Sequence, residues 1–232
     1  MTRPNAITVA RIAVAPLVAL LPLVPSWEAR IAAFVLFIVA AVTDYWDGHL
    51  ARTRNLVTDL GRLLDPLADK LLLVGTFVPM WWLMRDSHLL IPLRSFPTMR
   101  PEFPFVTPLG FVALPVWIPL VVLGREAFMT VFRHLAARRG VVIAAIGPAK
   151  WKTTFQWIWV GAAYFWFFAA TLASQRGWEG SAAWRAFAHF IGIVGTLGMI
   201  GAVGLTLYSL WLYLRRYARV FRGAPVTSAA RR

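Results

Sequence analysis

Long apolar stretches are the feature that most constrains the fold of this chain. A helix rises about 1.5 Å per residue, so about 20 apolar residues cross a hydrocarbon core about 30 Å thick. The chain is 59% apolar and 15% charged, whereas soluble domains are about 45–50% apolar and about 25% charged. We therefore expect an all-α integral membrane protein, one domain over 1–232, with six transmembrane helices at 6–25, 29–53, 59–85, 109–138, 150–174 and 184–217.

Charge is distributed unevenly along the chain. Lys and Arg number 24 against 10 Asp and Glu, a formal charge of +14. A nucleic-acid-binding protein keeps such charge on a well-solvated fold, so we expect no nucleic acid and instead anionic membrane lipids or phosphates. If the N-terminus is cytoplasmic, the loops on the cytoplasmic side carry more Lys and Arg than the loops on the outer side. The positive-inside rule therefore predicts both termini in the cytoplasm. We expect residues 86–108, which contain five prolines, to form an ordered external loop, with a passive connector as the alternative.

Acidic residues gather at one junction between two predicted helices. The chain has no Cys, and its four His lack ligand spacing, so any metal would rest on Asp and Glu. Asp44 and Asp47 are three residues apart, and Asp65 and Asp69 are four apart, which places each pair on one helical face. A hairpin that turns near Leu56 would bring both pairs to matching depths. The sequence therefore predicts four converging carboxylates.

Carboxylates inside a membrane helix are costly and indicate a functional site. Salt bridges to Arg52, Arg62 or Lys70 are one alternative, but four like charges at one depth repel unless cations lie between them. A cation or proton transporter is a second alternative, although it predicts acids spread through the bilayer. All-oxygen ligation suits two Mg²⁺ or Mn²⁺ ions, and paired metals favour phosphoryl chemistry.

Residues 44–69 carry a recognisable pattern. They read D-Y-W-D-G-H-L-A-R, then eight residues, then G-R-L-L-D-P-L-A-D. This resembles the signature D-x-x-D-G-x-x-A-R-x8-G-x3-D-x3-D of the CDP-alcohol phosphatidyltransferases. The resemblance implies that family's fold, a six-helix membrane enzyme, often a homodimer, that displaces CMP from a CDP-linked lipid.

The resemblance also implies roles for individual residues. Asp44, Asp47 and Asp65 would bind the metals, and Asp69 would be the general base and also a ligand. The residues implied to line the CDP-lipid site are Gly48, Ala51, Arg52 and Gly61, together with Asn5, Thr8 and Arg11 of an N-x-x-T-x-x-R opening. Asn5 and Arg11 could equally be an N-cap and an interfacial anchor.

A second set of polar residues is predicted to hold the acceptor alcohol. These are Arg125, Arg133, Lys150, Lys152 and Thr153, near one cytoplasmic mouth. Such cations suggest an acceptor that bears phosphate, and snorkelling to lipid headgroups is the alternative for Arg133, Lys150 and Lys152. The surrounding segments resemble those of bacterial phosphatidylglycerophosphate synthases, apart from Ala149 where Gly is common and a longer outer loop.

That likeness implies transfer of the phosphatidyl group from CDP-diacylglycerol to glycerol 3-phosphate, in a bacterial inner membrane with the site facing the cytoplasm. The alternatives keep the chemistry and change the acceptor. Phosphatidylglycerol would make the protein a cardiolipin synthase, and inositol phosphate would make it a phosphatidylinositol-phosphate synthase.

Overall fold

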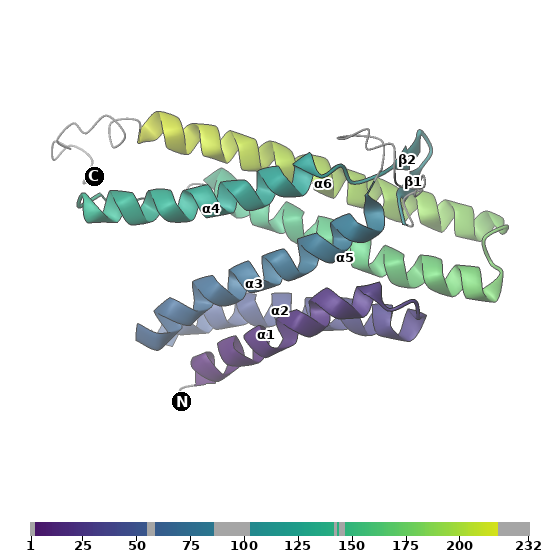
Figure 1. Cartoon of the computed structure of the whole chain (residues 1–232), viewed down its shortest axis with the longest axis horizontal. Coiled ribbons are helices and arrows are strands. Elements are labelled where there is room, and N and C mark those ends of the chain that lie inside the picture. The colour runs from purple at the N-terminus through teal and green to yellow at the C-terminus, as the bar shows by residue number, and fades with distance from the viewer. Residues whose placement is uncertain (1–2, 55–58, 86–102, 142, 144–146, 218–232) are drawn as a thin grey trace, which may run out of the picture.

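The computed structural model describes residues 3–54, 59–85, 103–141, 143 and 147–217. This described part folds into six long helices, one 3-10 turn and one small sheet (Figure 1). The elements are α1 (Arg3–Leu20), η1 (Leu21–Leu23), α2 (Trp27–Arg54), α3 (Asp59–Met84), β1 (Phe105–Thr107), β2 (Gly110–Val112), α4 (Trp117–Arg138), α5 (Gly147–Arg176) and α6 (Ala182–Arg216).

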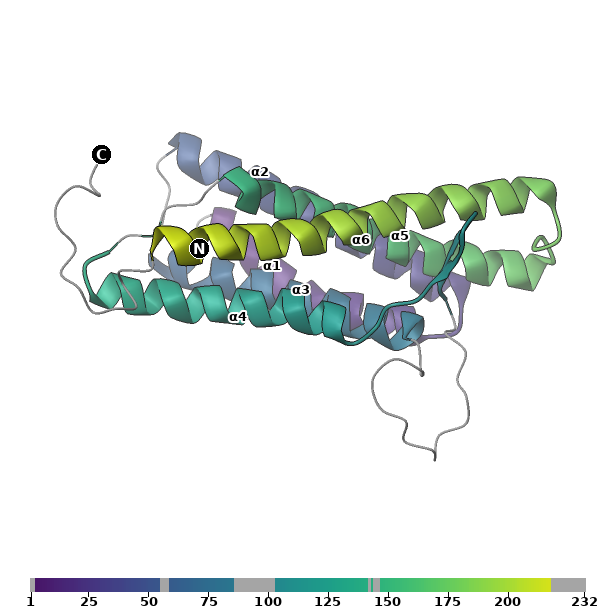
Figure 2. The same cartoon turned by 90° about the horizontal axis from the view of Figure 1, so that it is seen from above.

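The helices lie lengthwise beside one another in an elongated bundle, and successive helices run in opposite directions (Figures 1 and 2). One end of the bundle holds the starts of α1, α3 and α5 and the ends of α2, α4 and α6. We call this the basic end, because Arg138 and Arg139 close α4 there and Arg215 and Arg216 close α6. The other end holds η1, the hairpin of β1 and β2, and the turn between α5 and α6.

Three of the described helices are long and apolar enough to cross a membrane. Their spans are 66–84 in α3, 151–176 in α5 and 182–216 in α6. The apolar stretch Thr8–Leu23 is shorter than these. The protein is therefore a helical membrane protein. The described part has six helices, as many as the predicted crossings, but only three of them are long and apolar enough to meet the criterion for a membrane span.

The helix predicted over 109–138 begins later than expected. In the structure, Phe105 pairs with Val112 and Thr107 with Gly110 in an antiparallel hairpin, and α4 starts only at Trp117. Gly110 adopts a φ of 126°, which a helix does not tolerate. Residues 86–102 of the predicted outer loop lie outside the described residues.

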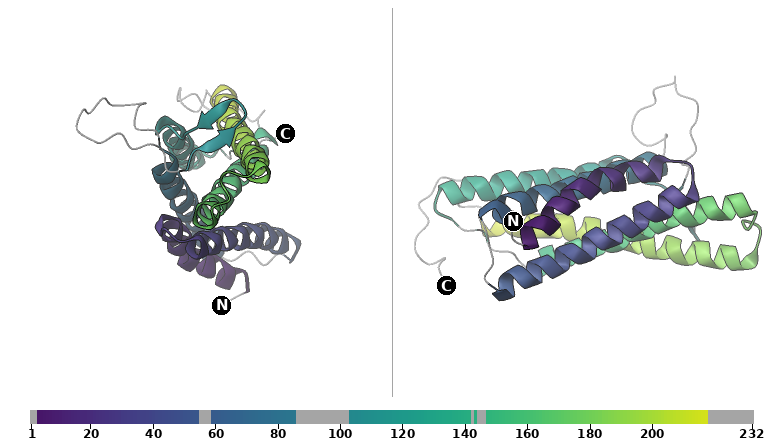
Figure 3. Two further views of the ribbon diagram at one scale, coloured as in Figure 1. Left: turned by 90° about the vertical axis from the view of Figure 1, so that its right-hand side faces the viewer. Right: turned by 90° about the horizontal axis from the view of Figure 1, so that it is seen from below.

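Glycines on α6 let the hairpin pack closely against that helix (Figure 3). A Cβ added at Gly192 would lie 1.9 Å from the carbonyl oxygen of Val106, and one at Gly195 would lie 2.2 Å from the ring of Phe105. Any larger residue would displace β1. The ring of Phe105 is thereby fully buried between helices.

Aromatic side chains fill the middle of the bundle. The rings of Phe77 and Trp159 meet edge to face at 5.0 Å and join α3 to α5. The hydroxyl of Tyr164 on α5 donates to the carbonyl of Val18 on α1 at 3.1 Å. This core fixes α1, α3 and α5 relative to one another, and the polar residues described next lie between it and the basic end.

Candidate active site

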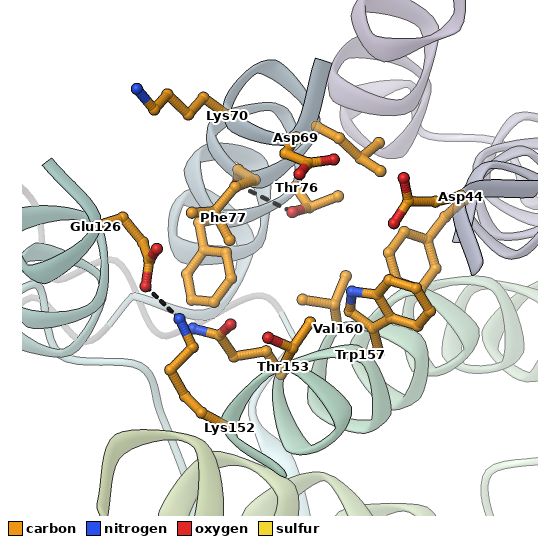
Figure 4. Close-up of a pocket in the computed structure, with 14 residues that line it drawn as sticks. Asp44, Asp69, Lys70, Thr76, Phe77, Glu126, Lys152, Thr153, Trp157 and Val160 are labelled. Carbon is orange, nitrogen blue, oxygen red and sulfur yellow. Dashed lines mark hydrogen bonds and ion pairs between the residues drawn. The ribbon is translucent and has the colours of Figure 1, made fainter. Parts of the chain in front are cut away.

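Asp44 and Asp69 face one another between α2 and α3. Asp44 lies ten residues before the end of α2, and Asp69 lies ten residues after the start of α3. Each is therefore about 15 Å from the basic end along its helix. Figure 4 shows both carboxylates pointing into one pocket. The predicted matching depth of these two residues is confirmed.

Arg11 of α1 joins the two carboxylates. Its guanidinium forms an ion pair with Asp44, and its Nη1 lies 3.5 Å from Oδ1 of Asp69. Arg11 is 4% exposed, and Thr8, one turn earlier, is also buried. An interfacial anchor would be solvated, so that alternative for Arg11 is wrong. The salt-bridge partners considered from sequence for the acids did not include Arg11.

A second charged cluster lies between α4 and α5. The carboxylate of Glu126 accepts hydrogen bonds from Arg125, at 2.8 Å, and from Lys152. Arg125 and Lys152 are each 5% exposed. Arg125 also donates through Nη2 to Ser209 of α6 at 3.1 Å. Snorkelling is therefore excluded for Lys152, whose ammonium group turns inward.

The other predicted acceptor residues are less closely grouped. Arg133 is exposed, and its guanidinium lies 6.0 Å from the centre of the Tyr213 ring. Thr153 is exposed at the pocket wall, where its hydroxyl donates to the carbonyl of Ala149 at 3.5 Å. The side chain of Lys150 lies outside the described part.

Both clusters contribute residues to one pocket with a volume of about 180 Å³, to which α2, α3, α4 and α5 all contribute (Figure 4). Arg11 and Arg125 are not among its lining residues. Its polar lining includes Asp44, Asp69, Glu126 and Lys152, and its apolar lining includes Phe77. Thus residues predicted for metal binding and residues predicted for acceptor binding share a single cavity.

The predicted metal ligands are only partly within the described side chains. Asp44 and Asp69 supply oxygen donors to the pocket, as hard divalent cations require. Asp47 and Asp65 lie on unbroken helices, one turn from Asp44 and Asp69 respectively, and therefore on the same helical faces. Their side chains are not described, and among those that are, no three Asp, Glu or His gather. The chemistry of the two described donors fits the predicted ions.

Several predicted CDP-lipid residues also have side chains outside the described part. These are Asn5, Gly48, Ala51, Arg52 and Gly61. The pocket residues that were not predicted from sequence include Glu126, which links the cations, and Gln156 on α5. The spacing could have indicated Gln156, because it follows Lys152 by four residues and so shares its helical face.

Comparison with known proteins places these residues in a family. A profile described as CDP-alcohol phosphatidyltransferase matches residues 1–208. The chain belongs to this family. The predicted enzyme class is thereby confirmed, and the transporter alternative is not retained.

Relatives within the CDP-alcohol phosphatidyltransferases carry two kinds of name. A CDP-diacylglycerol--glycerol-3-phosphate 3-phosphatidyltransferase of Bacillus subtilis is 36% identical over 68% of this chain and 74% of its own length. A protein of the same name from Rickettsia bellii is 49% identical over 40% of this chain and 53% of its own. A cardiolipin synthase (CMP-forming) of Streptomyces coelicolor is 33% identical over 60% of this chain and 54% of its own.

Proposed function

We propose that this phosphatidyltransferase transfers the phosphatidyl group of CDP-diacylglycerol to glycerol 3-phosphate, giving phosphatidylglycerol phosphate and CMP. The single observation that carries the proposal is the shared pocket, in which the buried ammonium group of Lys152 lies in the same cavity as Asp44 and Asp69. A cation inside the pocket suits an acceptor that carries a phosphate. The names of the Bacillus and Rickettsia relatives support the same acceptor.

The two carboxylates differ in a way that fits two roles. The Asp44 side chain is 35% exposed and is the closer partner of Arg11, whereas the Asp69 side chain is 62% exposed. Asp69 is therefore the more accessible to an incoming alcohol. In the proposed reaction, Asp69 accepts the proton of the primary hydroxyl of glycerol 3-phosphate. The alkoxide oxygen forms a bond to the lipid-side phosphorus, and the bond from that phosphorus to CMP breaks.

Two divalent cations, Mg²⁺ or Mn²⁺, are proposed as cofactors. Asp44, Asp47, Asp65 and Asp69 would hold these ions, which when bound would supply positive charge to offset the negative charge that develops on the leaving CMP. Arg11 positions the carboxylate of Asp44. Thr8 lies about one turn before Arg11 on the same face of α1. The residues proposed to line the CDP-lipid site are Thr8 and Arg11, together with Asn5, Gly48, Ala51, Arg52 and Gly61.

Arg125 and Lys152 are proposed to bind the acceptor phosphate, with Arg133, Lys150 and Thr153 contributing at the mouth of the pocket. Glu126 holds the two buried cations together and leaves the trio of Arg125, Glu126 and Lys152 with one net positive charge. That residual charge favours a phosphate without adding two uncompensated charges to the interior.

All six helices are proposed to cross a bacterial inner membrane as one domain, with both termini and the pocket on the cytoplasmic side. The alternating helix directions and the basic end of the bundle support this topology (Figure 2). Anionic lipids are the proposed neighbours of that end, and the protein is proposed to act as a homodimer.

The second candidate is cardiolipin synthesis, which the name of the Streptomyces relative favours. The same chemistry would then use phosphatidylglycerol as the acceptor. Incubating the purified protein with labelled CDP-diacylglycerol and one acceptor at a time separates the candidates. We expect lipid product with glycerol 3-phosphate and none with phosphatidylglycerol or inositol phosphate. Product with only one of the latter two would contradict the proposal.

A further inference from the structure

Gln156 is a buried polar residue of the pocket that the mechanism above does not use. It lies on α5, is 4% exposed and lines the pocket together with Asp69 and Lys152. Its side-chain Nε2 has no hydrogen-bond partner among the described residues. A buried amide nitrogen without a hydrogen-bond acceptor is unfavourable, and native proteins seldom retain one without a reason. A ligand that entered the pocket could supply the missing hydrogen bond.

The position of Gln156 defines which part of a ligand it would meet. It follows Lys152 by four residues, so it lies on the same face of α5, one turn further from the basic end. The pocket has the Lys152 and Glu126 cluster on one side and Asp44 and Asp69 on another (Figure 4). An acceptor whose phosphate meets Lys152 and whose reacting hydroxyl meets Asp69 therefore has its middle beside this wall.

The chemistry of a primary amide narrows the ligand group further. An amide both donates and accepts hydrogen bonds, and so does an alcohol hydroxyl. Glycerol 3-phosphate has three polar groups, and the proposed function assigns its phosphate and its primary hydroxyl. Its C2 hydroxyl lies between them and has no assigned partner. The same pocket has an apolar lining that includes Leu73, Phe77 and Val160, and an unpaired hydroxyl in it would be costly.

We propose that the Gln156 side-chain amide binds the C2 hydroxyl of the acceptor and makes Gln156 a specificity-determining residue. This inference rests on the proposed function and extends it. With the phosphate and the reacting hydroxyl fixed at two points, a third contact at C2 also distinguishes the two mirror-image glycerol phosphates. The site then selects a phosphorylated 1,2-diol of one handedness.

The test uses an acceptor that lacks only the C2 hydroxyl of glycerol 3-phosphate. 3-Hydroxypropyl phosphate keeps the primary hydroxyl and the phosphate at the same separation but has no C2 hydroxyl. Initial rates of CMP release are measured for both acceptors with the full-length wild type, with Gln156→Met and with Gln156→Leu. We expect both variants to lose at least about tenfold in kcat/KM for glycerol 3-phosphate, because the site no longer pairs with that hydroxyl. For 3-hydroxypropyl phosphate, kcat/KM should change by less than about twofold.

Activity with 3-hydroxypropyl phosphate also reports whether the variants are folded. Gln175, exposed on the same helix and absent from the pocket lining, provides the matched control. Gln175→Met should leave both values unchanged. Preference for sn-glycerol 3-phosphate over its mirror image should fall in both Gln156 variants.

Two results would overturn the inference. An equal loss of kcat/KM with both acceptors would show that the amide contacts the phosphate or has a structural role. Unchanged kcat/KM for glycerol 3-phosphate in the variants would show that Gln156 does not contribute to acceptor recognition. A wild type inactive with glycerol 3-phosphate would instead overturn the proposed function, so the two failures are distinguishable.

Discussion

Two charged residues each form ion pairs with two other residues at the pocket. Arg11 is shared between Asp44 and Asp69, and Glu126 is shared between Arg125 and Lys152. A buried charge that loses an ion-pair partner is strongly unfavourable, so Glu126 helps to hold the buried Lys152 in place and Arg11 helps to hold Asp44. The geometry of the site thus depends on residues that need not touch the reacting atoms.

Asp69→Asn tests the proposed general base. The amide keeps the shape of the side chain but cannot accept the proton of the alcohol. CMP release should fall by about 10²–10⁴-fold, while binding of CDP-diacylglycerol is largely retained. Glu179→Gln, an equivalent change at an exposed acidic residue in the turn between α5 and α6, should be silent. Unchanged turnover by Asp69→Asn would remove this residue as the base.

Lys152→Met tests the acceptor phosphate contact. Loss of the buried ammonium group should raise KM for glycerol 3-phosphate by at least about tenfold, since charge-assisted hydrogen bonds are among the stronger ones. KM for CDP-diacylglycerol should stay within about twofold, because Lys152 belongs to the other cluster. Arg215→Met, at an exposed cation near the end of α6, controls for the loss of a positive charge. Equal effects on both substrates would contradict the assignment.

Residue spacing predicted part of this site and could not predict the rest. The intervals between Asp44 and Asp47 and between Asp65 and Asp69 define faces of single helices, and the turn between them defines their shared depth. No spacing rule says that α1 packs beside both α2 and α3. The ion pairs of Arg11 with Asp44 and Asp69 could therefore not be predicted from spacing alone. The role of Glu126 could not be predicted for the same reason, because its partner Lys152 is 26 residues away in the sequence.

At the level of elements, the hairpin is the largest departure from the sequence prediction. Leu109, Phe111 and Val112 are apolar, so a search for apolar length extends the next helix back to residue 109. Two exposed hydrophobic residues, Leu109 and Phe111, instead occupy the hairpin, and β1 packs on α6. Strand pairing over three residues leaves no periodic signal in the sequence.

Glycine substitutions in α6 test that packing. Gly192→Ala would place a methyl group 1.9 Å from the Val106 carbonyl oxygen, so the strand must shift. Overpacking of this kind costs about 1–3 kcal/mol, and the thermal midpoint in detergent should fall. Gly204 has nothing within 4 Å of an added Cβ, so Gly204→Ala should be neutral or stabilising by about 0.5–1 kcal/mol through its better helix propensity. A lower midpoint for Gly204→Ala than for Gly192→Ala would contradict the packing shown here.

For the whole molecule, the predicted number of helices agrees with the described part, yet the apolar criterion alone supports three spans. The charges of the site account for part of this difference. Helix α4 carries Arg125, Glu126 and Arg133 within one stretch, and α2 carries Asp44. Helices that build a polar pocket inside a membrane are less apolar than helices that only face lipid.

The absence of Cys from the sequence allows a direct test of topology. Glu179→Cys lies in the turn between α5 and α6, and Arg138→Cys lies at the basic end of α4; both native residues are exposed. A membrane-impermeant thiol reagent should label Glu179→Cys in spheroplasts and Arg138→Cys only after permeabilisation. Labelling of both positions before permeabilisation would contradict the alternating arrangement.

Carboxylates of α2 and α3 are proposed to support a divalent-cation-dependent transfer, and the rate of CMP release measures that dependence. The purified wild type is freed of metal with a chelator and assayed with CDP-diacylglycerol and glycerol 3-phosphate while Mg²⁺ or Mn²⁺ is titrated back. We predict no CMP release in chelator, recovery with either ion, and a higher metal requirement for Asp44→Asn. CMP release at the full rate in excess chelator would contradict a metal-binding role for these carboxylates.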